Sequence, residues 1–118
     1  MTPALFDVIE LLVDLPAYQL RSGTLGAIVH VHSDATYEVE FTNKEGETTA
    51  LCPLTAEQFL VVWQAETRSW LPLAEHIAAL VTHLPEEAGR EVLDFARFLH
   101  ERRQRQHPSS STHAETKK

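Results

Sequence analysis

The sequence is short of several residue types, and each shortage narrows the classes of protein to which the chain can belong. Cys52 is its single cysteine among 118 residues, so no disulfide can form within the chain, as is usual in a reducing compartment. No apolar run approaches the ~20 residues that a membrane-spanning helix needs. The first fourteen residues contain no Lys or Arg, whereas a secretory signal begins with basic residues. We therefore expect a cytoplasmic protein.

Positive charge is also scarce over the first half of the chain. Residues 1–63 hold nine acidic residues against Arg21 and Lys44, and the whole chain has a formal net charge of −7. Five basic side chains gather near the C-terminal end instead: Arg102, Arg103, Arg105, Lys117 and Lys118. Because nucleic acids are polyanions, we expect the first half to repel them, and only the basic tail to allow a weak contact. No membrane contact is expected.

Apolar periodicity predicts five short strands within residues 1–63. The clearest is residues 37–41, in which every second residue is apolar and the others are acidic. Pro53 is expected to end the fourth strand, because proline lacks the backbone N–H that a sheet uses. One helical turn at residues 55–58 then precedes a last strand at 59–63. Five strands with a long first loop predict an SH3-like β-barrel.

After a linker at residues 64–69, the apolar period changes to that of helices. We expect an α-helical hairpin over residues 70–105, with a break at Pro85 and a second helix that ends near Arg103. The acidic first turn and basic last turn of this helix suit its dipole. Residues 106–118 are rich in Pro, Ser, Thr and Lys and predict a disordered tail. The expected fold is mainly β plus α.

Three separated segments of the first half resemble one known family. Residues 5–16 (LFDVIELLVDLP), 20–29 (LRSGTLGAIV) and 37–41 (YEVEF) occur in order. They resemble a bacterial SH3-like domain family of unknown function, with the pattern D-V-V-x-L-L-x-D-L-P, L-x-x-G-x-x-G-x-V-V and Y-x-V-E-F. Over residues 5–63 the resemblance implies a small barrel without catalytic residues. Some members lie in operons that resemble toxin–antitoxin pairs.

The second half resembles a different, helical family. Residues 84–99 (LPEEAGREVLDFARFL) are similar to its signature L-P-E-E-x-x-x-E-V-L-D-F-x-x-F-L, and the resemblance extends over residues 71–103. That family resembles antitoxins of the VapB type, so both halves imply an antitoxin-like role by analogy. Gly89 fits a helix poorly, by about 1 kcal/mol relative to Ala. The predicted barrel also resembles KOW-type modules that bind RNA, but its acidic charge disfavours phosphate contacts.

The second predicted helix has more apolar surface than one neighbouring helix can cover. Five residues form its central apolar stripe: Ala88, Val92, Phe95, Ala96 and Leu99. Leu93 and Phe98 lie on the two flanks, so the apolar arc exceeds the roughly 100° typical of a surface helix. Two interpretations stay open, because the barrel can cover the rest or these flanks can dock on a second subunit or a toxin. Trp70 likewise either seals a joint or forms an exposed hot spot.

Two sets of residues are the candidates for partner binding. The predicted partner-binding residues are Leu93, Phe98, Trp70, Phe95 and Arg102. The predicted acidic face consists of Glu38, Glu40, Glu45 and Glu47. These glutamates are either an ordinary solvated surface or a means of steering a basic partner toward the chain.

The residues that catalysis or metal binding needs are not found at the right spacing. His30 with His32 and His76 with His83 form two pairs, but neither pair has Cys, Asp or Glu at ligand spacing. We therefore expect no metal and no cofactor. Cys52 is expected to be a small buried apolar residue. No nucleophile and base are paired, so we expect no catalytic residues and no enzyme activity.

These observations favour a non-enzymatic protein-binding module of the antitoxin-like or immunity-like kind, which neutralises or docks a partner protein. The partner is then another protein, such as a basic toxin, or a second copy of the chain. The alternative is an accessory or assembly subunit of a larger complex, in which the helical hairpin is a dimerisation element.

Overall fold

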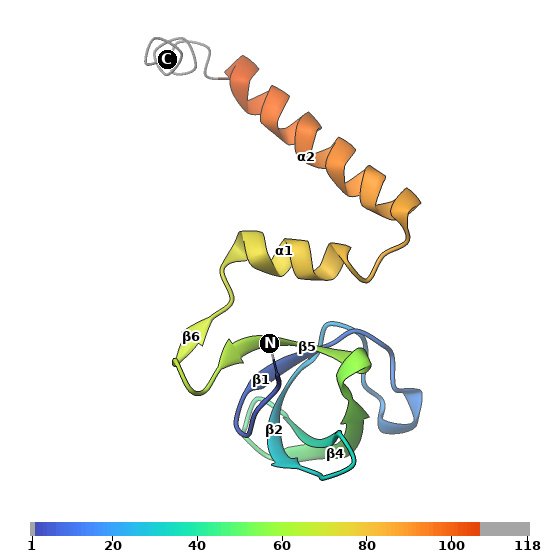
Figure 1. Ribbon diagram of the computed structural model, residues 1–118, viewed down its shortest axis with the longest axis vertical. Coiled ribbons are helices and arrows are strands. Elements are labelled where there is room, and N and C mark those ends of the chain that lie inside the picture. Colours follow the sequence, from blue (N-terminus) through green and yellow to red (C-terminus); the bar gives the residue numbers. More distant parts are fainter. Residues whose placement is uncertain (1, 107–118) are drawn as a thin grey trace. The chain divides into compact units, whose positions relative to one another are not determined.

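The computed structural model describes residues 2–106 and has the expected mixture of strands and helices (Figure 1). The chain divides into two compact units. We call them the sheet unit, Met1–His76, and the helical unit, Ile77–Lys118. The elements are β1 (Val8–Leu11), the 3-10 turn η1 (Pro16–Tyr18), β2 (Leu25–Val31), β3 (Thr36–Thr42), β4 (Thr48–Thr55), the 3-10 turn η2 (Ala56–Gln58), β5 (Phe59–Gln64), β6 (Ser69–Trp70), α1 (Leu73–Val81) and α2 (Glu86–Gln106).

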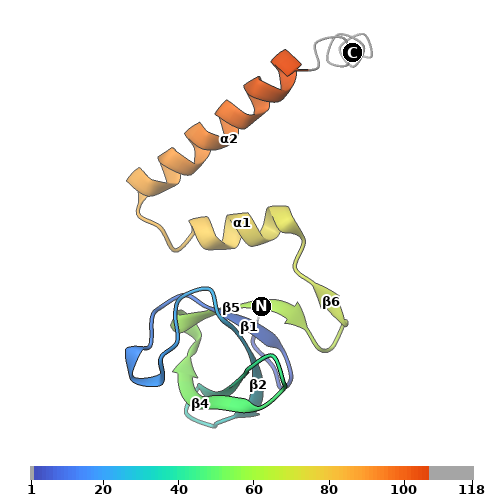
Figure 2. The same ribbon diagram turned by 180° about the vertical axis from the view of Figure 1, so that it is seen from behind.

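The strands form one antiparallel sheet in the order β4-β3-β2-β1-β5-β6. The prediction of a five-stranded closed barrel is therefore wrong. β6, a sixth strand, pairs with the end of β5 so that Trp70 lies opposite Trp63. Figures 1 and 2 show that the sheet curls strongly, yet β4 and β6 remain its two edges, so it is open.

β4 continues through Pro53, contrary to the prediction that this residue ends the strand. The strand runs from Thr48 to Thr55, and Pro53 lies opposite Glu38 of β3. β4 is an edge strand that pairs on one side only. Proline is tolerated there because an edge strand does not need every backbone N–H for the ladder. The helical turn predicted at residues 55–58 is present as η2, with a capping box between Thr55 and Gln58.

The core of the sheet unit lies on the inward face of these strands. Alternation along β3 buries Tyr37, Val39 and Phe41, as the sequence pattern predicts. The buried core also includes Ile9, Leu11, Ile28, Cys52, Leu54, Phe59 and Val61. Packing is so close at Gly26 that a Cβ there would lie 2.7 Å from the Phe41 ring. The sheet unit therefore has a dense core of its own.

The helical unit contrasts with this core, because α1 and α2 contain no buried residue. We call the central residues Ala88, Val92, Phe95, Ala96 and Leu99 the α2 stripe. A packed hairpin was predicted, yet Phe95 and Ala96 are exposed and Val92 and Leu99 are only half-buried. Near the turn, a Cβ on Gly89 would make ordinary contact with Val81 at 3.7 Å. No described helix is long and apolar enough to cross a bilayer.

α2 is longer than predicted at its C-terminal end, since it continues past Arg103 to Gln106. Glu86 and Glu87 occupy its first turn and Arg103 and Arg105 its last, which suits the helix dipole. The predicted disordered tail, residues 106–118, lies outside the described residues apart from Gln106.

Candidate protein-binding surfaces

The largest exposed apolar side chains of the helical unit lie on α2. Phe95 is 60% exposed, Phe98 51% and Leu93 47%. A soluble surface helix normally turns such side chains toward a core. Because α2 has no buried residue, the helical unit itself leaves these side chains uncovered.

Three of the predicted partner-binding residues gather on α2. The rings of Phe95 and Phe98 are stacked, with centroids 6.1 Å apart. The Arg102 guanidinium lies over the Phe98 ring at 5.7 Å, within the range of a cation–π contact. Leu93 belongs to the other flank of the helix, as its sequence spacing indicates. Aromatic rings beside an arginine are the composition typical of binding hot spots.

Trp70 belongs to the sheet unit, on the edge strand β6. Its ring lies 6.4 Å from that of Trp63 and is tilted by 59°, while its side chain is 62% exposed. Trp63 is half-buried. The sequence left two interpretations of Trp70 open. Its exposed side chain fits a contact surface better than a position buried in a joint.

The four glutamates of the predicted acidic face follow β3 and the turn into β4. Glu38 and Glu40 lie on β3, and Glu45 and Glu47 lie in the turn between β3 and β4. Nε2 of His32 lies 3.1 Å from Oε1 of Glu38. The hydroxyl of Thr48 donates a hydrogen bond to Glu40. Glu38 and Glu40 are thus half-buried and in contact with neighbouring side chains. They are therefore less available to a partner than the sequence suggests.

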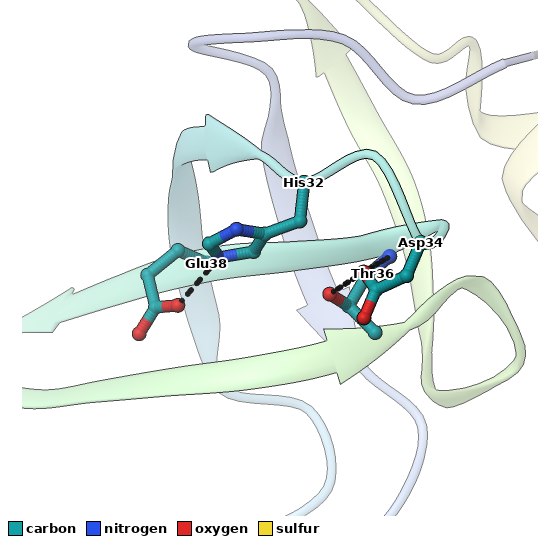
Figure 3. Close-up of polar contacts among 4 residues, drawn as sticks. All are labelled: His32, Asp34, Thr36 and Glu38. Carbon is teal, nitrogen blue, oxygen red and sulfur yellow. Dashed lines mark hydrogen bonds and ion pairs between the residues drawn. The ribbon is translucent and has the colours of Figure 1, made fainter.

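Local hydrogen bonds also order the turns that border this face. Oδ1 of Asn43 accepts the backbone N–H groups of Glu45 at 2.9 Å and Glu47 at 3.0 Å. At the β2–β3 turn, Figure 3 shows Asp34 beside Thr36, whose hydroxyl donates to Asp34 at 2.6 Å. This hydrogen bond holds the pKa of Asp34 below its usual value. The acidic face is therefore presented by well-defined hairpins.

The structure places His30 and His32 side by side and buries Cys52 in the sheet unit. The rings of His30 and His32 lie 4.5 Å apart, edge to face. Within residues 2–106, however, no group of three His, Cys, Asp or Glu side chains is placed to hold a metal ion. Cys52 is fully buried in the core. Burial raises the pKa of its thiol, and the charge of Glu38 adds to the effect.

Shallow pockets occur on the sheet unit. One, of about 350 Å³, lies beside η1 and is lined by Asp14, Pro16, Gln19, Leu20 and Arg21. There the Asp14 carboxylate accepts the backbone N–H of Ser22 at 2.8 Å. This carboxylate is thus occupied in shaping the loop, which favours a structural role for it over a ligand-binding one.

Two polar features of the sheet unit were not predicted. Asp7 is buried, and its carboxylate accepts the backbone N–H groups of Ala4 at 3.0 Å and Ala65 at 2.8 Å. Nε2 of His76 lies 2.7 Å from Oε1 of Glu10, which joins the first turn of α1 to β1. The contacts of Asp7 with Ala65 and of Glu10 with His76 join residues 58 and 66 positions apart, so no local sequence pattern signals them.

Two known families match the chain, each over a separate segment. Residues 5–61 match the family described as a domain of unknown function, DUF4926. Residues 76–118 match the family described as a protein of unknown function, DUF2281. No curated protein and no solved structure matches the chain. The matches overlap the two segments in which the sequence shows resemblances, residues 5–63 and 71–103, and neither description includes a function.

Proposed function

We propose that this chain is a non-enzymatic protein-binding module, antitoxin-like or immunity-like, that docks on a partner protein through α2. The observation that carries the proposal is the exposure of Phe95, Phe98 and Leu93 on a helix without a buried residue. Large apolar groups on an ordered surface are typical of protein interaction sites. Their burial against a partner supplies the driving force.

These side chains supply part of the free energy that specific binding needs, and the rest has to come from further contacts. Removing two large apolar side chains such as Leu93 and Phe98 from water contributes roughly 3–6 kcal/mol before the costs of association. The Arg102 guanidinium over the Phe98 ring adds a charged group beside the aromatic side chains, a combination typical of binding hot spots.

The acidic sheet unit suits a basic partner, such as a basic toxin. Nine acids and two basic residues in residues 1–63 give this part of the chain a strongly negative field. Opposite charge on a partner raises the association rate more than the final affinity. We expect an association rate that falls steeply as salt is added. A rate that does not depend on salt would remove the acidic face from the proposal.

Affinity capture from the native host, with the full chain as bait, tests the proposal. We expect one protein to be enriched by the wild type and by the control Gln104→Glu, which changes the charge at an exposed position about three turns from Leu93 and away from the α2 stripe. Capture of that same protein should fall at least about tenfold with Phe98→Asp or Leu93→Asp. Circular dichroism confirms that each variant keeps its fold. Equal capture by Phe98→Asp, Leu93→Asp and wild type would overturn the proposal.

A further inference from the structure

The charges of α2 are divided between its two halves. Residues 86–94 hold four acidic side chains against Arg90, and residues 97–105 hold four arginines against Glu101. The halves therefore carry opposite net charges of equal size. The helix dipole explains only part of this pattern, because its influence is confined to the first and last turns.

Two of these charges border the α2 stripe on the same side. At about 100° per residue, Glu91 and Arg102 differ by only ~20° around the helix axis. Neither takes part in an ion pair with another side chain of residues 2–106. Arg102 instead lies over the ring of Phe98. Glu87 and Arg105 repeat the arrangement further out along the same border.

An antiparallel pair of α2 helices satisfies this charge pattern. When two identical helices pair about a two-fold axis with opposite directions, residues of the same border face each other and the two ends exchange places. Glu91 of one copy then lies opposite Arg102 of the other, twice by symmetry. A parallel pair instead lays the acidic half of α2 beside the acidic half of its copy and the arginine-rich half beside the arginine-rich half, which is unfavourable.

We propose that α2 binds α2 of a second copy in antiparallel orientation, about a two-fold axis near residue 96, and that this covers the α2 stripe. The inference rests on the proposed protein-binding role of α2 and names the protein that covers the stripe. Leu93 lies ~120° from the stripe centre and stays available to another partner. A two-helix contact is smaller than a standard interface, so we expect a dissociation constant in about the micromolar range.

Charge reversal followed by analytical ultracentrifugation of the full chain tests the pairing. Glu91→Arg alone sets arginine opposite arginine, and Arg102→Glu alone sets acid opposite acid. We expect each single variant to raise the dimer dissociation constant about tenfold or more. The double variant Glu91→Arg/Arg102→Glu restores both pairs and should dimerise like the wild type. Arg97→Glu, on the opposite side of α2, is the matched control and should leave dimerisation unchanged.

Mixing the two single variants sharpens the test. A heterodimer of the Glu91→Arg chain with the Arg102→Glu chain has an opposite-charge contact at both sites, whereas each homodimer has none. We therefore expect the mixture to associate at least as tightly as the wild type. Circular dichroism on each variant separates loss of pairing from loss of the helix.

The possible failures are distinguishable from failure of the proposed function. A wild-type chain that stays monomeric up to high concentration overturns the pairing, while capture of a partner that depends on Leu93, which lies outside the paired face, is measured separately. Single variants that dimerise like the wild type overturn the antiparallel orientation, because a parallel pair does not set Glu91 opposite Arg102. The inference is also overturned if a captured protein binds only the monomer and is no longer captured by the Glu91→Arg variant. The α2 stripe is then the binding site of that protein.

Discussion

The sheet unit and the helical unit use their apolar residues in opposite ways. In the sheet unit, side chains such as Ile9, Val39 and Phe41 are removed from water by their own strands. In α2, by contrast, the side chains of Phe95 and Phe98 remain more than half exposed. The first unit thus has a dense core of its own, and the second leaves the large apolar side chains of α2 exposed. Substitutions of the same type in the two units should therefore differ sharply in effect.

The largest contrast is expected between Phe41→Ala and Phe95→Ala. Phe41 is 1% exposed in the core, and removing such a ring costs about 3–5 kcal/mol of folding free energy. Phe95 is mostly exposed, so its loss should change the stability of the single chain by less than ~0.5 kcal/mol. Urea unfolding, followed by tryptophan fluorescence and circular dichroism, measures both. Equal destabilisation by the two variants would show that α2 is covered within its own chain.

Substitution of two glycines by alanine is expected to change stability in opposite directions. Gly26→Ala places a Cβ 2.7 Å from the Phe41 ring and 2.8 Å from Val39, and such overpacking costs about 1–3 kcal/mol. At Gly89 the nearest atom is Val81 Cγ1, at 3.7 Å. Gly89→Ala should therefore strengthen α2 by about 1 kcal/mol of helix propensity. Thermal unfolding and the helical signal at 222 nm report the two effects, and destabilisation by Gly89→Ala would contradict an uncrowded α2.

A third contrast concerns two aspartates. The buried Asp7 carboxylate accepts two backbone N–H groups, so Asp7→Ala leaves them without a partner and should cost about 1–3 kcal/mol. Asp94 and Arg97 form a long, exposed pair with a separation of 3.9 Å. Asp94→Ala should change stability by less than about 0.5 kcal/mol. Denaturant midpoints compare the two, and a tolerant Asp7 would mean that water replaces the carboxylate.

The sequence predicted those features that depend on neighbouring residues. Alternation along residues 37–41 was enough to predict the buried face of β3, and the acidic and basic ends of α2 were enough to place that helix. Features that depend on the rest of the sheet were not predicted. Pro53 was read as a strand end, because nothing in the sequence marks β4 as an edge strand. The two-residue strand β6 and the contact of Asp7 with Ala65 depend on pairing between segments that are distant in sequence.

Only part of the candidate binding surface on α2 was predicted, again because burial depends on contacts between segments that are distant in the sequence. Helical spacing alone identified Phe95, Phe98 and Leu93 as more apolar surface than one helix can cover. Burial of the stripe against the first helix was also expected, but a pattern of apolar residues does not say which surface they meet. The engagement of Glu38 with His32 required the actual register of β2 and β3, which shifts between Ile28 and His30.

The smallest expected effect is a pH dependence that belongs to the sheet unit. Because the pKa of Cys52 is raised by burial, the folded state holds the thiol proton more tightly than the unfolded state does. This contribution to stability is complete below the unfolded pKa and is lost as the pH rises through the folded value. Urea midpoints from pH 7 to 10 should fall more for the wild type than for Cys52→Ala. Parallel curves would show that the thiol does not contribute.

Hydrogen exchange of the full chain over a range of concentrations tests most directly whether α2 is completed by another protein surface. We expect the amides of β1, β2, β3 and β5 to exchange slowly at every concentration, because their strands are covered by their own core. The amides of α2 should exchange quickly in dilute protein and slow down as the concentration rises or a captured partner is added. Strong protection of α2 in the most dilute sample, equal to that of the sheet, would contradict the account.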